Sequence, residues 1–119
     1  MIFQKIEDVS RSIWSQSSSK PNPFLNFNFF HALETSGCVG PETGWNPIYL
    51  ENERSLLYSF IKQHSYGEYI FDWDWARAFQ QYKLPYYPKL TSMVPFTPVN
   101  TSHFLMPEFD QARALEIFK

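Results

Sequence analysis

Residues that can transfer protons are concentrated between His64 and Trp75, where the chain reads HSYGEYIFDWDW. The run combines a histidine and three carboxylates with large apolar and aromatic side chains. A carboxylate placed among tyrosine and tryptophan loses hydration, which raises its pKa toward the range that a general base needs near neutral pH. Glu68 and Asp72 are therefore our candidate general bases, with His64 as a helper or second base.

A turn between two elements must position these side chains. We predict an elbow in which a strand ends at Gly67 and a helix begins near Asp72, whose carboxylate caps the first turn. Asp74 then lies near the positive end of the helix dipole. Apolar residues at helical spacing form one broad stripe on this helix, namely Phe71, Trp75, Ala78, Phe79 and Tyr82. The aromatic elbow is a candidate floor for a ligand pocket.

The same residues also have a purely structural interpretation, which the residue types alone favour. In that interpretation Asp72 only caps its helix, and Glu68 pairs with Lys89 or Arg77. His64 is then a hydrogen-bonded histidine at the end of a strand.

Other kinds of site are less well supported. A metal site from His64, Glu68 and Asp72 is disfavoured, because Gly67 interrupts the helical spacing and no third neutral ligand is evident. We therefore expect no metal. The Gly-x-Ser-x-Gly motif of a serine nucleophile does not occur. Cys38 is the only cysteine, which excludes an internal disulfide and a cysteine-based zinc site.

The composition is that of one aromatic-rich domain or of part of a larger one. Of the 119 residues, 44% are hydrophobic, 19% are aromatic and 18% are charged, and the net charge is −2. Lysine and arginine are not clustered, which argues against a DNA-binding surface. We see no signal peptide and no membrane-spanning run, and with a single cysteine a reducing cytoplasm fits best.

Apolar patterns and capping residues predict an α/β (α+β) fold, with a short mixed or antiparallel sheet flanked by helices. Pro95 and Pro98 cannot donate to a regular ladder, so the chain should leave the sheet between them. The expected elements are a helix starting near Asp8, a surface loop from Ser15 to Pro23, a helix from Asn26 to Ser36, strands at 45–51, 56–62, 89–94 and 103–106, and a last helix from Pro107.

The last predicted helix has an apolar side made of Phe109, Ala112, Leu115 and Phe118. It reaches Lys119 without a glycine or another stop signal. We therefore expect the natural sequence to continue, with this chain as the front part of a longer protein.

Several blocks of sequence carry a family resemblance. They are HSYGEYIFDWDW at 64–75, YYPKL at 86–90 and VPFTPV at 94–99, preceded by NPFL at 22–25, ALE at 32–34, SGCVG at 36–40 and TGW at 43–45. In this order they resemble the signature of a bacterial FemAB-like family of peptidoglycan-biosynthesis or GNAT-type N-acyltransferases. The chain departs from that pattern at Gln63, at Asp74 and at Asn100-Thr-Ser102, where the family has a small residue, alanine and Gly-Pro-Arg. Asp74 is therefore a poor candidate for shared chemistry.

The resemblance implies a partial GNAT-like fold, with residues 1–119 as the N-terminal region and a missing C-terminal half as its partner. Typical GNAT enzymes hold coenzyme A with an Arg/Gln-x-x-Gly-x-Gly/Ala loop. That loop is absent, since Gly67 is the only glycine after Gly44. We therefore expect this segment to bind no cofactor, with acyl-CoA or aminoacyl-tRNA as the possible donor of the full-length protein.

In such a transferase this chain would form the acceptor side of the cleft, where a small-molecule or muropeptide-like amine is acylated. Acyl transfer needs a base and donors to the oxyanion, and Glu68 and Asp72 would be the catalytic bases. The expected substrate-binding residues are His64, Tyr66, Tyr69, Tyr87, Lys89 and Thr97, with the tyrosines as hydrogen-bond donors and Lys89 facing a carboxylate or phosphate. The alternatives are a non-catalytic, aromatic-lined module that binds a sugar or peptide, and an inactive fragment.

Overall fold

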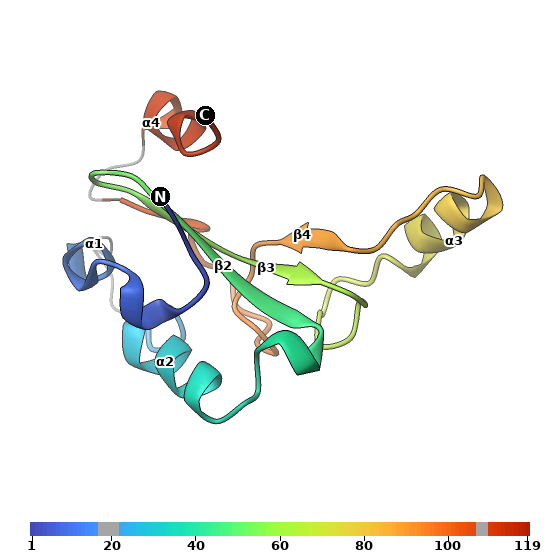
Figure 1. The fold of residues 1–119 in the computed structure, drawn as a ribbon, viewed down its shortest axis with the longest axis horizontal. Coiled ribbons are helices and arrows are strands. Elements are labelled where there is room, and N and C mark those ends of the chain that lie inside the picture. The colour runs from blue at the N-terminus through green and yellow to red at the C-terminus, as the bar shows by residue number, and fades with distance from the viewer. Residues whose placement is uncertain (17–21, 107–109) are drawn as a thin grey trace.

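The computed structural model describes residues 1–16, 22–106 and 110–119, and in these residues an antiparallel sheet carries helices (Figure 1). The elements are β1 (Ile2–Phe3), the 3-10 helix η1 (Ile6–Asp8), α1 (Arg11–Gln16), α2 (Phe27–Thr35), the 3-10 helix η2 (Pro41–Thr43), β2 (Trp45–Glu51), β3 (Leu56–Lys62), α3 (Trp73–Gln81), β4 (Lys89–Thr91), β5 (Phe104–Leu105) and α4 (Gln111–Glu116). The α+β class is confirmed, and every strand pair in the described residues is antiparallel. No helix there is long and apolar enough to cross a bilayer.

The β2–β3 hairpin is the centre of the sheet, and both strands have the predicted bounds. The strand order is β1-β2-β3-β4, and β5 also pairs with β3. β3 therefore lies inside the sheet, as its apolar residues on both faces predict. β1 pairs only with Tyr49 and Leu50, so Pro47 lies in a part of β2 that β1 does not reach. A proline is tolerated there because no ladder hydrogen bond is needed from it.

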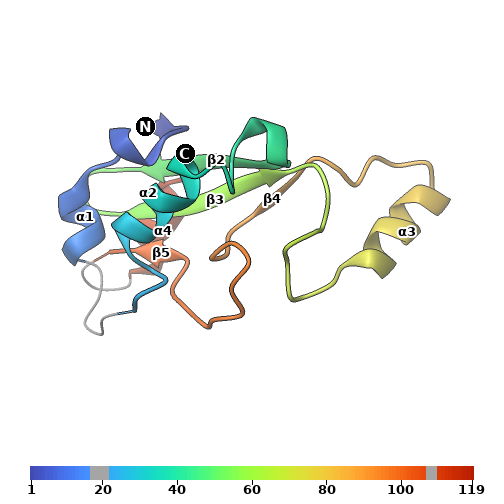
Figure 2. The same ribbon diagram turned by 90° about the horizontal axis from the view of Figure 1, so that it is seen from below.

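β4 and β5 share one edge of β3, and the chain between them leaves the sheet. β4 pairs with Phe60–Lys62, whereas β5 pairs with Leu56 and Leu57. The predicted strands at 89–94 and 103–106 are thus shorter than expected. We call residues 92–103 the excursion loop and residues 63–72 the elbow. Both segments lie below the sheet in Figure 2. Pro95 and Pro98 explain why this loop forms no ladder.

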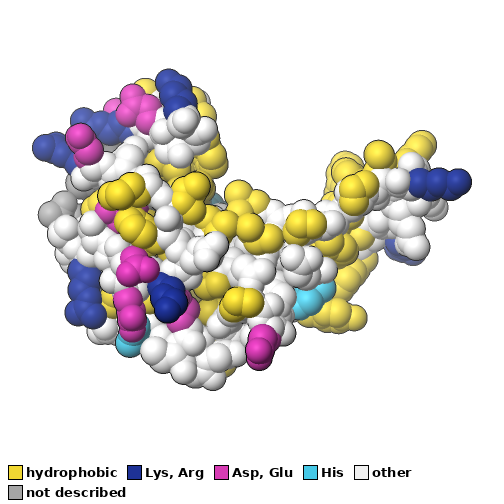
Figure 3. Space-filling view, in the orientation of Figure 1, with side chains coloured by type: hydrophobic (Ala, Val, Ile, Leu, Met, Phe, Trp, Pro, Cys, Tyr) yellow, Lys and Arg dark blue, Asp and Glu magenta, His cyan; other side chains and the backbone are white. Residues whose placement is uncertain are grey.

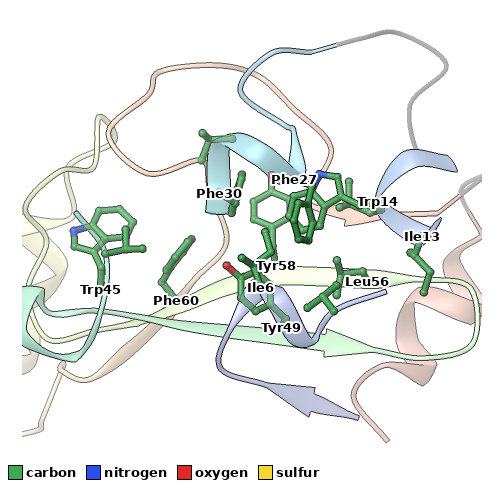
Figure 4. Close-up of a cluster of buried hydrophobic side chains, with 14 residues drawn as sticks. Ile6, Ile13, Trp14, Phe27, Phe30, Trp45, Tyr49, Leu56, Tyr58 and Phe60 are labelled. Atoms are coloured by element: carbon green, nitrogen blue, oxygen red, sulfur yellow. The ribbon is translucent and has the colours of Figure 1, made fainter. Parts of the chain in front are cut away.

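The core lies between the sheet and the N-terminal helices (Figure 4). Phe30 of α2 packs edge-on against Tyr58 of β3 at 5.2 Å between ring centroids, and Trp14 of α1 packs against Phe30 at 5.0 Å. Asn26 caps α2 as predicted, since its side chain accepts a hydrogen bond from the Asn28 amide at 2.8 Å.

One half-buried and one buried carboxylate join the N-terminal segment to this core. Glu34 of α2 accepts hydrogen bonds from the Ile6 amide and from the Tyr49 hydroxyl. Burial raises the pKa of Glu34, although these hydrogen bonds oppose the shift. Glu51 accepts hydrogen bonds from the Ser10 amide and hydroxyl just before α1.

Several expectations for the elbow and α3 need correction. β3 ends at Lys62 rather than at Gly67, and α3 begins at Trp73 as expected. Asp72 occupies the N-cap position, but its side chain makes no capping hydrogen bond. The predicted apolar stripe is not a buried face. α3 projects from the body of the molecule with hydrophobic side chains on its surface (Figures 1 and 3), and Trp75 and Tyr82 are 67% and 79% exposed.

The last helix also differs from its prediction. α4 begins at Gln111, and Asp110 caps it by accepting hydrogen bonds from the Ala112 and Arg113 amides. Its buried residue is Ala114, whereas Ala112 and Leu115 are exposed. Phe118 is also exposed, so the prediction that these residues form a buried apolar side is wrong for those that the structure describes. Pro107 and Phe109, and residues 17–21 of the predicted surface loop, lie outside the described residues.

The predicted N-terminal helix also differs from the observed structure. The expected helix near Asp8 is divided into η1 and α1, with Val9 and Ser10 between them. Ile6, Val9, Ile13 and Trp14 are buried as the apolar pattern predicts.

Gly67 is the point at which the elbow and the excursion loop touch. Its φ is +81°, and a Cβ built there would lie 2.7 Å from the Phe96 ring and 2.9 Å from the Trp45 ring. Phe96 in turn packs on Trp45 at 5.0 Å between ring centroids. Glycine is required at this position both for the backbone conformation and for the space.

We predict that Gly67→Ala destabilises the protein more than Gly37→Ala. Gly37 also has a positive φ, +76°, but a Cβ there meets nothing within 4 Å. The control should lose about 1 kcal/mol from the left-handed conformation alone. Overpacking should add roughly 1–3 kcal/mol at Gly67. Urea denaturation of both variants checks this, and equal losses would show that the Phe96 contact does not constrain the elbow.

Candidate functional site

Four charged side chains join the elbow to the sheet. The Lys89 ammonium of β4 lies 2.7 Å from Glu68 Oε2 and also donates to Asp72 Oδ2. The Lys62 ammonium at the end of β3 lies 3.3 Å from Glu68 Oε1. Glu68 is therefore held between two ammonium groups, one from each strand. We call Lys62, Glu68, Asp72 and Lys89 the ion cluster.

Strand register places both lysines at this position. Lys62 pairs with Trp45 on one side and with Lys89 on the other. Its side chain is fully buried, with Nζ 3.3 Å from the centre of the Trp45 ring and 2.6 Å from the Tyr66 carbonyl, to which it donates. Burial lowers the pKa of Lys62, and the nearby Glu68 carboxylate opposes that shift.

All three N–H groups of the Lys89 ammonium are engaged. They point to Ser65 Oγ at 2.8 Å, to Glu68 and to Asp72. Burial alone would lower the pKa of Lys89, but the hydrogen bonds to Asp72 and Glu68 raise it above its ordinary value. An ammonium has three donors, so an incoming anion would have to displace one of these contacts. The expectation that Glu68 pairs with Lys89 is confirmed, whereas Arg77 pairs with the exposed Asp74.

Asp72 does not have the raised pKa that its aromatic neighbours suggested. Burial alone would raise it, but the hydrogen bond from Lys89, assisted by others such as that from Tyr86, lowers the pKa of Asp72 to about 2. The same contact raises the pKa of Tyr86 to about 12, because the hydroxyl donates to a carboxylate. Asp72 is thus a stable anion and a weak base near neutral pH. The side chain that should have capped α3 is committed to Lys89 instead.

A cavity of about 800 Å³ opens between the elbow, β4 and the excursion loop. Its described lining residues are Glu68, Tyr69, Ile70, Asp72, Tyr86, Lys89, Leu90, Thr91, Ser92, Met93, Thr97, Pro98, Val99, Asn100, Thr101 and His103. This lining contains five of the eight predicted site residues, which are Glu68, Tyr69, Asp72, Lys89 and Thr97.

The net charge of this lining depends on which members of the ion cluster line the cavity. Glu68, Asp72 and Lys89 line the cavity, whereas the buried Lys62 does not. With neutral histidine, the described lining therefore carries two negative charges and one positive charge, a net charge of −1. A cavity of this sign favours a cationic ligand over an anionic one.

The other predicted residues have structural partners around the cavity. His64 donates from Nε2 to the Thr43 carbonyl at 2.9 Å and accepts at Nδ1 from the Tyr66 amide at 3.1 Å, so both ring nitrogens are used. Tyr66 is 69% exposed and packs on Trp73. The Tyr87 hydroxyl bonds to Ser65 Oγ at 2.6 Å. These residues shape the elbow without lining the cavity.

The end of the cavity at the excursion loop has a second polar group, which sequence reasoning missed. Ser92 Oγ donates to the Tyr58 carbonyl at 2.7 Å and lies 3.2 Å from His103 Nδ1. The Tyr58 hydroxyl bonds to Thr101 Oγ1 at 2.9 Å. Only the shared pairing of β4 and β5 with β3 brings Ser92 and His103 together. The one signal in the sequence was a histidine at the start of a predicted strand.

Comparison with known proteins identifies the family. A family model named FemAB-like, described as peptidoglycan biosynthesis/recognition, matches residues 5–118. The chain belongs to the FemAB-like family, which places it in a peptidoglycan-related transferase context. Members of the family are typically N-acyltransferases, and the FemAB family generally uses aminoacyl-tRNA donors. No curated protein and no solved structure matches the chain significantly.

We predict that Asp72 stabilises the fold at neutral pH and that this contribution is lost in acid. Its pKa falls from an ordinary 3.8 to about 2 on folding. A depressed pKa stabilises the native state above the unfolded-state value by about 2 kcal/mol, and the effect fades as the pH falls from about 4 to about 2. Asp72→Asn should therefore cost stability at pH 7 and progressively less below pH 4.

Urea titrations at several pH values measure this difference, and Asp74→Asn is the matched control. Asp74 is two residues away in an exposed ion pair with Arg77, so its substitution should change stability little at any pH. A loss for Asp72→Asn that does not vary with pH would contradict the proposed ion pair.

Proposed function

We propose that this chain forms the acceptor side of a FemAB-like N-acyltransferase, in which the cavity binds an amine that receives an acyl or aminoacyl group. The observation that carries the proposal is the net charge of −1 on the described lining, beside a lysine whose donors are all engaged. An amine acceptor is a cation before it is deprotonated, so it is attracted to this site. Family membership supports N-acyl transfer as the reaction class.

Glu68 and Asp72 act electrostatically in this proposal rather than as paired bases. Lys89 holds both carboxylates in place by ion pairs. Lys62, which does not line the cavity, forms an ion pair with the other oxygen of Glu68. A preorganised carboxylate stabilises a cationic ligand without having to reorganise when the ligand binds. Tyr69 and Thr97 lie in the same lining and would contact the remainder of the acceptor.

The apolar part of the lining fits a ligand that carries an apolar portion in addition to its amino group. Leu90 and Ile70 are exposed at 55% and 87%, and Val99 lies on the excursion loop facing the same space. A cavity with several apolar walls and a few convergent polar groups is typical of small-ligand sites. A muropeptide-like stem with an amino group at its end has this combination.

The acyl donor is assigned to a different surface. Both candidate donors, acyl-CoA and aminoacyl-tRNA, carry phosphates, which need free cationic groups or backbone donors. The one cation in the described lining of this cavity is Lys89, and its donors are occupied. We therefore do not assign Lys89 to a ligand carboxylate or phosphate, and its role is to hold Glu68 and Asp72.

We predict that the chain binds a lysine-containing muropeptide and that Leu90→Arg weakens this binding about tenfold. The variant adds a positive charge to the cavity lining, and tenfold corresponds to about 1.4 kcal/mol. Leu84→Arg is the matched control, because Leu84 is 56% exposed, close to the 55% of Leu90, but lies outside the cavity lining. Isothermal titration with the muropeptide and with its Nε-acetylated form measures both effects.

The outcomes separate the possible functions. Binding that needs the free amine and is weakened only by Leu90→Arg supports an acceptor site. Equal binding of the acetylated form favours the non-catalytic peptide- or sugar-binding module instead. Equal effects of both arginine variants would place the ligand elsewhere, and no binding at all would refute the proposal.

A further inference from the structure

We propose that His103 is the group that removes the proton from the acceptor amine in this cavity, an inference that rests on the function proposed above. Neither the family match nor the sequence motifs assign a role to His103. It lies at the junction of the excursion loop and β5 and lines the cavity that also contains Glu68 and Asp72.

The hydrogen bonds of Ser92 decide which ring nitrogen of His103 carries the proton. A serine hydroxyl has one hydrogen, and that of Ser92 is donated to the Tyr58 carbonyl, which can only accept. Ser92 Oγ must then accept in its contact with His103 Nδ1 at 3.2 Å. The neutral imidazole is therefore the Nδ1–H tautomer, and Nε2 carries the lone pair.

Nε2 is the nitrogen left for a ligand. It has no hydrogen-bond partner among the described residues, and the ring belongs to the lining of the cavity. The orienting group is itself well anchored, because the Tyr58 carbonyl belongs to β3 at the centre of the sheet and Tyr58 is fully buried. A base whose second nitrogen is held by a fixed partner is the arrangement that general base catalysis requires.

The other ionisable side chains are less suitable for this step. Asp72, with its pKa lowered to about 2, is a weak base. Both oxygens of Glu68 face lysine ammonium groups. His64 uses both ring nitrogens in contacts with the backbone. His31 pairs with Glu7 at 3.1 Å and does not line the cavity.

The acceptor binds as an ammonium ion and gives up one proton to solvent before it reacts. The resulting amine nitrogen attacks the carbonyl carbon of the acyl ester or thioester donor and forms the new C–N bond. The nitrogen then carries a positive charge, and its next proton passes to His103 Nε2, which becomes an imidazolium. The C–O or C–S bond to the carrier breaks, and the imidazolium returns its proton to the departing oxygen or sulfur. Glu68 and Asp72 stabilise the positive charge that is on the nitrogen during the attack.

We predict that nitrogen NMR of the chain with ¹⁵N-labelled histidine shows His103 as the Nδ1–H tautomer with an unprotonated Nε2. Ser92→Ala should shift His103 toward a mixture of tautomers, because the acceptor that selects Nδ1–H is removed. This response tests the hydrogen bond that selects the tautomer, and contact of Nε2 with the amine is tested separately by the titration described next. His31→Asn, His64→Asn and His103→Asn assign the signals, and His31→Asn is also the control that leaves the cavity unchanged.

Titration with the lysine-containing muropeptide then tests contact with the amine. The Nε2 signal of His103 should shift on addition of the free amine and should not shift with the Nε-acetylated form. In His103→Asn the asparagine amide can donate to Ser92 in place of Nδ1, so the variant should keep the fold of the free protein. Its fold is checked by circular dichroism.

The other outcomes distinguish the role of His103 from the proposed function. An Nε2–H tautomer overturns the role of His103, whether or not the muropeptide binds. Amine-dependent binding without any change at His103 Nε2 overturns the inference and leaves the proposed function intact. A chain that binds neither muropeptide refutes the proposed function, and the role of His103 fails with it.

Discussion

The contact between Lys89 and the elbow carboxylates is the interaction on which the rest of the site depends. Glu68 and Asp72 belong to a segment without regular structure, and Lys89 begins a strand of only three residues. Their mutual attraction holds the elbow against the sheet. A buried ion pair contributes little net stability by itself, but removing one partner leaves an uncompensated charge and costs about 3–5 kcal/mol. The buried Lys62 makes this arrangement possible, because it balances the second carboxylate from inside the protein.

The same pairing sets the net charge of the cavity lining. Lys62 neutralises charge from a position that no ligand reaches, so the accessible lining keeps an excess of negative charge. Lys89 has no donor left for an anion. The cluster therefore joins the elbow to the sheet and, in the function proposed above, gives the cavity a preference for cationic groups. The structural and functional interpretations of Glu68 are compatible for this reason.

The cavity itself is a consequence of two segments that cannot join the sheet. Pro95 and Pro98 force residues 92–103 out of the ladder, and Gly67 allows the elbow to approach Phe96 closely. Because β4 and β5 return to the same edge of β3, the two ends of the excursion loop come together at Ser92 and His103. Both ends of this loop are therefore fixed to the central strand, which places Ser92 next to His103.

The sequence by itself determined the features that depend on neighbouring residues. The hairpin of β2 and β3, the capped helix α2, the start of α3 and the family blocks all follow from local periodicity, turn residues and motif order. It also identified most of the polar lining on the elbow, because Glu68 and Asp72 lie within one short run. The tertiary structure alone decided how these groups behave. Lys89, brought by strand pairing, lowers the pKa of Asp72 and takes it from its helix cap. Strand pairing likewise joins Ser92 to His103. A pKa and a tautomer are set by atoms a few ångströms away, and those atoms come from segments far apart in the chain.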